Sequence, residues 1–175
     1  MPLVRNQDLA LWARDIVRLE TPVIARWRVP AETRSLLVGV GLPALDTRFV
    51  PDPQGVHEPR LGGMYVIGRE LQLANHIHLP ECAECGYFGL REDSGEVIYR
   101  WRGEVDHASF VNSSLRHFLY FIHRQGAATS RYSDLPDDKM IPLYERVVSR
   151  LKAWDSVALN HESSFWRARF ARLWG

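Results

Sequence analysis

The chain of 175 residues has little cysteine, almost no net charge and no long apolar run. Its net charge of +1 gives no overall field that favours nucleic acid or an anionic membrane as a partner. No apolar run approaches the roughly 20 residues of a membrane-spanning helix. The first segment contains Asp8, Asp15 and Glu20 and lacks an unbroken apolar core, which argues against a secretory signal. We therefore expect a cytoplasmic protein without membrane or direct nucleic-acid partners.

Catalytic signatures are also absent from the sequence. There is no G-x-S-x-G elbow and no glycine-rich phosphate loop. Ser113, His107 and Asp106 are the residue types of a hydrolytic triad, but Ser113 is better explained as a helix cap. The sequence therefore predicts a protein that is not an enzyme and uses no cofactor.

The only two cysteines lie in the segment HIHLPECAEC, residues 76–85. Cys82 and Cys85 have the C-x-x-C spacing of zinc ligands, and His76 and His78 would face the same way on a strand. Zinc sites usually close with ligands from a distant segment, whereas these four residues are all local. We favour an inert loop and assign no metal ligand. A zinc-binding module or a small metal-dependent enzyme is the alternative.

The clearest pattern in the chain is a strand-to-helix junction in FVNSSLRHFLYFI, residues 110–122. Ala108–Val111 has the pattern of a strand end, and Asn112 or Ser113 can then cap a helix that runs to about His123. The apolar residues Leu115, Phe118, Leu119 and Ile122 of that helix follow at i, i+3, i+4 and i+7.

The remaining segments alternate between helix and strand patterns. Helices are predicted for Leu9–Leu19, Ala31–Val38, Ile141–Leu159 and a short stretch capped by Ser163 or Ser164. Strands are predicted for Met64–Ile67, Ile77–Leu79, Tyr87–Leu90 and Val97–Trp101, with a hairpin turn at Asp93–Gly95 and polar loops at 51–63 and 125–138. This order predicts a single α+β domain over residues 1–175, an antiparallel sheet of short strands flanked by N-terminal and C-terminal helices.

Several of the six tryptophans fall at helical apolar spacing. Trp12, Trp154 and Trp166 are therefore expected in the core. Trp101 is different, because it ends a strand among alternating charges in YRWRGEVDH, residues 99–107. It is a candidate for surface contact as well as for the core.

Three groups of residues together resemble the SUKH superfamily of bacterial immunity proteins, and within it the fourth SUKH family. They are TRSLLVGVGLP at Thr33–Pro43, VNSSLRHFL at Val111–Leu119, and the tail pairs Trp154-Asp155, Ala158-Leu159 and Phe165-Trp166. The resemblance implies a SUKH-like fold and a non-catalytic protein that binds and neutralises a cognate toxin. A general protein-interaction domain of the same fold is a further alternative.

The strand block and its loops carry an acidic excess together with aromatic side chains. This combination suits a basic toxin, such as a nuclease or deaminase that must hold nucleic acid. The predicted partner-binding residues are Glu81, Glu84, Tyr87, Glu92, Asp93, Glu96, Trp101, Glu104 and Asp106.

Overall fold

The computed structural model describes residues 15–45, 49–58, 63–71, 84–101, 108–132, 137–161 and 164–166. Its strands are β1 (Ile16–Val17), β2 (Leu42–Pro43), β3 (Val50–Pro51), β4 (His57–Glu58), β5 (Met64–Leu71), β6 (Glu84–Arg91), β7 (Val97–Trp101) and β8 (Ala108–Asn112). The helices are α2 (Thr21–Ile24), α3 (Ala31–Gly39), α4 (Leu115–Tyr132), α5 (Asp137–Trp154) and α6 (Ser156–Asn160). None of these helices is both long and apolar enough to cross a membrane.

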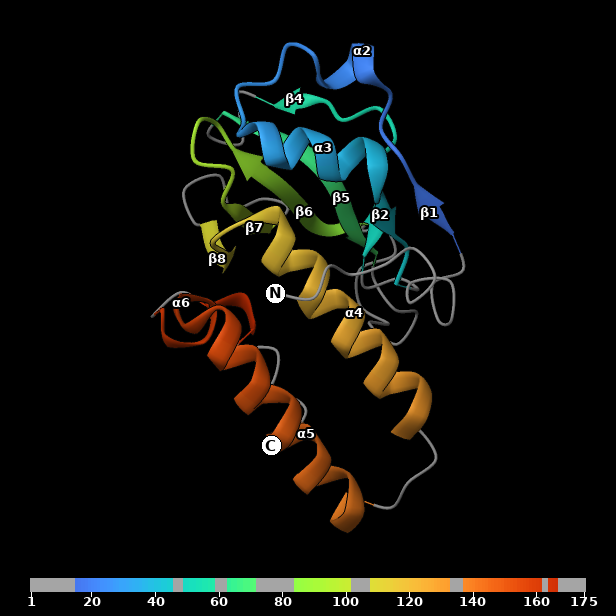
Figure 1. Cartoon of the computed structure of the whole chain (residues 1–175), viewed down its shortest axis with the longest axis vertical. Helices are drawn as coiled ribbons and strands as arrows, with labels where there is room; N and C mark the ends of the chain where they lie inside the picture. Colours follow the sequence, from blue (N-terminus) through green and yellow to red (C-terminus); the bar gives the residue numbers. More distant parts are fainter. Residues whose placement is uncertain are drawn as a thin grey trace.

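The main sheet is antiparallel, with the order β3-β5-β6-β7-β8 and with β4 also paired to β5. Helices α3 and α4 lie on one side of it, and α5 and α6 follow at its β8 end (Figure 1). The combination of this sheet with helices before and after it confirms the predicted α+β class.

Alternate residues of the strands form the core beneath α3 and α4, and we call this side of the sheet the helical face. Its buried side chains include Tyr65, Phe88, Leu90, Val97 and Tyr99. Phe118 of α4 is fully buried and packs edge to face on Phe49, with 5.2 Å between ring centroids. The opposite side, which we call the outer face, carries a second small apolar cluster of Met64, Val66 and Ile98.

The turn between β6 and β7 forms where it was predicted. Asp93 and Gly95 have φ angles of 60° and 70°, in the left-handed region that Asp tolerates and Gly adopts freely. The N–H of Gly95 donates to the carbonyl of Arg91, and the N–H of Arg91 donates to the carbonyl of Glu96. The local sequence therefore predicts this hairpin, and the backbone N–H of Asp93 adds a contact by donating to the carbonyl of Arg28.

The secondary structure or the bounds predicted for three segments are wrong. The helix predicted for Leu9–Leu19 is absent at Ile16–Val17, which instead forms β1 and pairs with β2; residues 1–14, with Trp12, lie outside the described residues. The predicted loop 51–63 contains part of β3 and all of β4. The helix predicted to end near His123 continues to Tyr132.

The predicted helix Ile141–Leu159 is two helices. Helix α5 begins earlier than predicted, at Asp137, and ends at Trp154. Asp155 then caps α6, which starts at Ser156. The predicted core positions of two tryptophans are confirmed, since Trp166 is buried and Trp154 packs on Tyr120 with 5.1 Å between centroids. The predicted strand Ile77–Leu79 lies outside the described residues.

Candidate functional site

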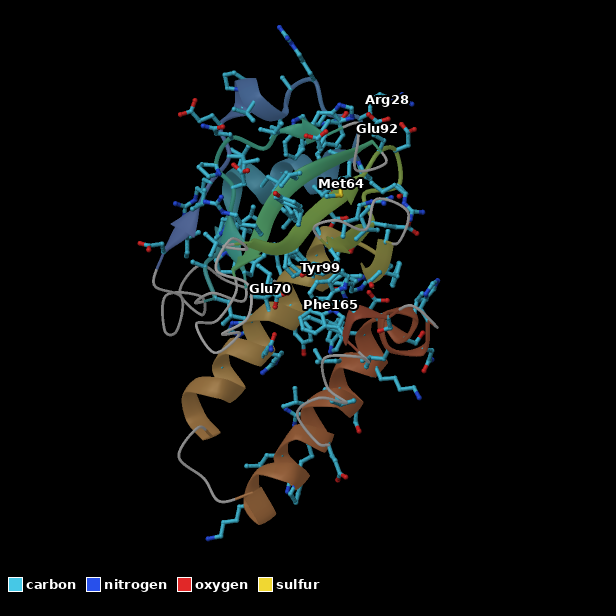
Figure 2. The ribbon with its side chains drawn as sticks, turned by 180° about the vertical axis from the view of Figure 1, so that it is seen from behind. Arg28, Met64, Glu70, Glu92, Tyr99 and Phe165 are labelled. Atoms are coloured by element: carbon cyan, nitrogen blue, oxygen red, sulfur yellow. The ribbon has the colours of Figure 1, made fainter. Side chains whose placement is uncertain are left out.

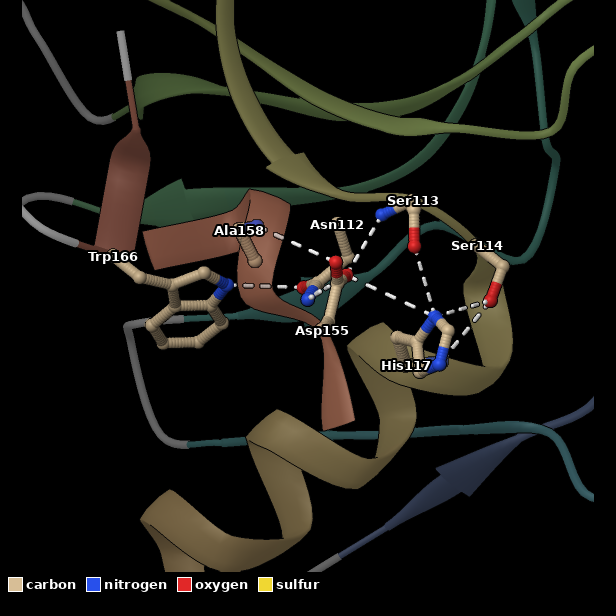
Figure 3. Close-up of polar contacts among 7 residues, drawn as sticks. All are labelled: Asn112, Ser113, Ser114, His117, Asp155, Ala158 and Trp166. Atoms are coloured by element: carbon tan, nitrogen blue, oxygen red, sulfur yellow. Dashed lines mark hydrogen bonds and ion pairs between the residues drawn. The ribbon is translucent and has the colours of Figure 1, made fainter. Parts of the chain in front are cut away.

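A buried polar cluster joins the end of β8 to the start of α6 (Figure 3). Asp155 is 4% exposed, and its Oδ2 accepts hydrogen bonds from Asn112 Nδ2 at 3.1 Å and from the backbone N–H of Ser113 at 2.9 Å. Its Oδ1 accepts from the backbone N–H of Ala158 at 3.3 Å, which caps α6. Asn112 Oδ1 accepts from Trp166 Nε1 at 3.0 Å. These buried polar groups therefore hold secondary-structure elements together.

His117 lies beside this cluster, in a geometry that does not match a hydrolytic triad. Its Nδ1 is 2.9 Å from Ser113 Oγ, 3.1 Å from Ser114 Oγ and 3.8 Å from Asp155 Oδ2. In a triad the serine and the carboxylate bond opposite ring nitrogens, so that the imidazole can relay between them. Here both hydroxyls and the carboxylate approach the same nitrogen, which supports a structural role for the cluster.

The cap of α4 is Ser114, and the prediction of Asn112 or Ser113 is wrong. Ser114 Oγ accepts from the backbone N–H of His117 at 3.3 Å, and its carbonyl accepts from the N–H of Phe118. The side chain of Asn112 instead contacts Asp155 and Trp166. Because three polar residues stand in a row, their order alone does not show which one caps the helix.

Replacing Ser114 with alanine should lower the free energy of unfolding by about 1 kcal/mol, because the N–H of His117 loses its acceptor. Urea denaturation measures the change. Ser35→Ala, at an exposed position in α3, is the matched control and should shift stability by no more than about 0.5 kcal/mol. A loss in Ser114→Ala no larger than in this control would contradict the capping role.

The predicted partner residues Glu92, Asp93 and Glu96 lie at the turn between β6 and β7. Arg28 Nη2 lies 3.0 and 2.8 Å from the two carboxylate oxygens of Asp93, and Arg28 Nη1 lies 3.7 Å from Glu92. Arg91 pairs with Glu96 at 3.1 Å. The acidic residues at this end of the sheet therefore already face cations of the same chain.

The predicted contact residue Trp101 lies at the other end of β7, about 16 Å along the strand from Glu96. Figure 2 shows the same separation, with Arg28 and Glu92 at one end of the sheet and Glu70 and Tyr99 nearer the other. Trp101 is 37% exposed, and no other Phe, Tyr or Trp side chain that the structure describes is exposed. Of the two interpretations of Trp101, the structure supports surface exposure.

The other predicted site residues are only partly covered by the structure. Tyr87 is half-buried in β6, and Glu84 begins that strand. Glu81, Glu104 and Asp106 lie outside the described residues, as does His107. Of the zinc candidates, Cys85 lies in β6, whereas His76, His78 and Cys82 lie outside the described residues. Within the described ranges no group of His, Cys, Asp and Glu is placed to hold a metal ion.

The model of the SUKH-4 immunity protein family matches residues 4–172. The chain belongs to this family. No curated protein and no solved structure matches this chain. The family predicted from the three resembling groups of residues is therefore confirmed.

Two residues of this SUKH-4 chain have contacts that the sequence analysis missed. Asp155 stood out only as part of a tail pair, although an Asp inside a helical apolar pattern is a recognisable start for a new helix. Glu70 was not selected at all, and it receives a hydrogen bond from the buried Tyr99 at 2.8 Å. No local signal identifies Glu70, because its partner lies 29 residues away on another strand.

Proposed function

We propose that this SUKH-4 protein binds a cognate protein toxin in the cytoplasm and neutralises it by covering its working surface, without turnover of its own. The family match over residues 4–172 is the observation that carries this proposal. The polar cluster around Asp155 and His117 supports the part of the proposal that concerns turnover, because its hydrogen bonds join elements of the fold to one another.

The charge of the proposed contact residues favours a basic toxin, such as a nuclease or a deaminase. Enzymes that hold nucleic acid carry basic surfaces, and acidic groups on a partner speed their association. An interface of standard size, about 1,600 Å² in total, needs a few desolvated anchors at its centre and a charged rim. The exposed Trp101 fits the first part. Glu92, Asp93 and Glu96, together with the arginines that they pair with, fit the charged rim.

The immunity function predicts that a toxin domain is encoded beside the gene for this chain, and the decisive test uses that domain. Co-expression should restore the growth of cells that produce this toxin domain. The purified pair should bind with nanomolar affinity, which corresponds to about −12 kcal/mol. Isothermal titration calorimetry measures the affinity, and a toxin domain of the same activity from an unrelated system is the control, which should be neither bound nor neutralised.

A folded, full-length chain that neither binds the adjacent toxin nor restores growth would contradict the immunity function. The general interaction-domain alternative would then take its place. Turnover of nucleic acid, peptide or ester substrates by the purified chain alone would contradict the non-catalytic part of the proposal.

A further inference from the structure

Helices α4 and α5 run side by side and extend beyond the sheet as a two-helix arm (Figure 1). Helix α4 is anchored by several buried side chains, among them Phe118 and Phe121. In α5, by contrast, no described side chain before Leu151 is buried. Most of α5 is therefore a surface element that a partner can reach.

The surface of α5 carries a line of exposed cations. Lys139, Arg146 and Arg150 are all exposed, and at about 100° per residue they fall within about 40° of one another around the helix. They span about 16 Å along the helix axis. Glu145 and Lys152 are also exposed, but both lie at least about 100° away from this line around the helix. We call Lys139, Arg146 and Arg150 the basic stripe.

The charge of the basic stripe is not neutralised by the part of the chain that the structure describes. None of its three side chains takes part in a hydrogen bond or an ion pair there. The acidic residues at the turn between β6 and β7 differ in this respect. Asp93 lies 2.8 Å from Arg28, and Glu96 lies 3.1 Å from Arg91. The basic stripe is therefore the charged surface that a partner can complement without first breaking an internal ion pair.

Half-buried apolar side chains border the basic stripe. Leu143 follows Lys139 by four residues and Trp154 follows Arg150 by four residues, so each is a neighbour of a stripe residue on the helix surface. The ring of Trp154 packs on that of Tyr120 of α4, with 5.1 Å between centroids. Exposed arginines beside partly exposed apolar groups are typical of protein–protein interfaces, in which arginine and aromatic residues are enriched.

A protein partner with an acidic surface fits the basic stripe better than a nucleic acid does. Three cations contact only a few phosphates, and the net charge of +1 adds little attraction for a polyanion. Carboxylates bind arginine through bidentate, charge-assisted hydrogen bonds, and a protein surface can also cover the bordering Leu143 and Trp154. Resting on the proposed function, we propose that the basic stripe of α5 docks an acidic surface of the cognate toxin. This surface is separate from the basic one with which such a toxin would hold nucleic acid.

The test measures binding of full-length variants to the adjacent toxin domain by surface plasmon resonance. Arg146→Glu combined with Arg150→Glu should raise Kd at least about tenfold, mainly through slower association, because charges at an interface steer the encounter. The association rate of this double variant should also lose its decrease with added salt. Arg150→Glu alone should raise Kd at least about fivefold. Lys152→Glu is the matched control, since it reverses the same charge on the same helix away from the stripe, and it should bind within about twofold of the original chain.

The outcomes separate this inference from the proposed function. Failure of the unmodified chain to bind the toxin contradicts the function itself. Nanomolar binding that persists within twofold in the double variant overturns the contact at the basic stripe and leaves the function standing. Tighter binding by the double variant also overturns it, because α5 would then face a basic surface of the toxin. Equal losses in Arg150→Glu and Lys152→Glu would trace the effect to net charge rather than to the stripe, and would contradict the inference as well.

Two further measurements guard against a folding defect and against a nucleic-acid partner. Thermal unfolding followed by circular dichroism should show no change in the variants, because both arginines are exposed and glutamate has a similar helix propensity. If the double reversal does not fold, Arg146→Gln with Arg150→Gln removes the charge instead and should still raise Kd about threefold. A labelled DNA duplex should bind the unmodified chain no more tightly than about 100 μM at physiological salt, as followed by fluorescence anisotropy. Tighter binding that the double variant abolishes would overturn the choice of a protein partner.

Discussion

Replacing Asp155 with alanine is expected to lower the free energy of unfolding by about 3–5 kcal/mol. The buried carboxylate accepts hydrogen bonds from the Asn112 side chain and from the backbone N–H groups of Ser113 and Ala158. Alanine leaves these donors without their acceptor, and each unsatisfied buried polar group costs about 1–3 kcal/mol. Urea denaturation followed by circular dichroism measures the loss.

Two further variants define what this loss means. Asp155→Asn keeps an acceptor oxygen without the charge and should fall between the original chain and Asp155→Ala. Glu145→Ala removes an exposed carboxylate from α5 and should change stability by less than about 0.5 kcal/mol. A loss below about 1 kcal/mol in Asp155→Ala would show that the cluster does not hold the junction of β8 and α6 together.

The elements that the sequence predicted well are those determined by neighbouring residues. The hairpin turn depends on Asp93 and Gly95, which suit positive φ angles, and the structure places both there. Helix α3 follows Pro30 and ends just before Gly41. Gly41 has a φ of +84°, and its N–H donates to the carbonyl of Leu36. In each case the local preference and the tertiary structure agree.

The elements that the sequence predicted poorly depend on contacts between distant segments. The segment that starts at Gln125 is polar and turn-rich and indicated a loop. Gln125 and Gly126 are nevertheless buried within α4, where packing outweighs the weak helix propensity of glycine. Ile16 fitted a helical apolar pattern, but it lies in β1 and pairs with Pro43 of β2, far along the chain. The residue propensities of a short window carry no information about contacts with such distant segments.

The placement of Glu70 and Trp101 on either side of Tyr99 was only partly predictable, for the same reason. Trp101 was selected from its local context, whereas Glu70 was not, because only the register of the sheet brings the two together. That register includes two irregularities between β5 and β6, at Val66–Gly68 and Glu70–Leu71. A shift of one residue would move Glu70 to the other face, so no count along the sequence could place it beside Trp101.

Gly86→Ala should reduce stability by about 2–3 kcal/mol, although it adds only one methyl group to a strand. The new Cβ would lie 2.4 Å from the backbone oxygen of Arg100 and 2.6 Å from the hydroxyl of Tyr99. The backbone oxygen cannot move away without disturbing the pairing of β6 and β7. The phenol of Tyr99 would also have to leave its place between Glu70 and Trp101.

Gly39→Ala is the matched control, since a Cβ there would meet nothing within 4 Å. Because Gly39 ends α3, alanine should leave stability unchanged or raise it by up to about 1 kcal/mol. Urea denaturation of the two variants should therefore give changes of opposite sign or a clear difference in size. Equal stability of Gly86→Ala and Gly39→Ala would mean that β6 tolerates a side chain at Gly86, which pairs with Glu70 on one side and with Trp101 on the other. The close approach of Tyr99 to Gly86 would then not be what orders Glu70 and Trp101.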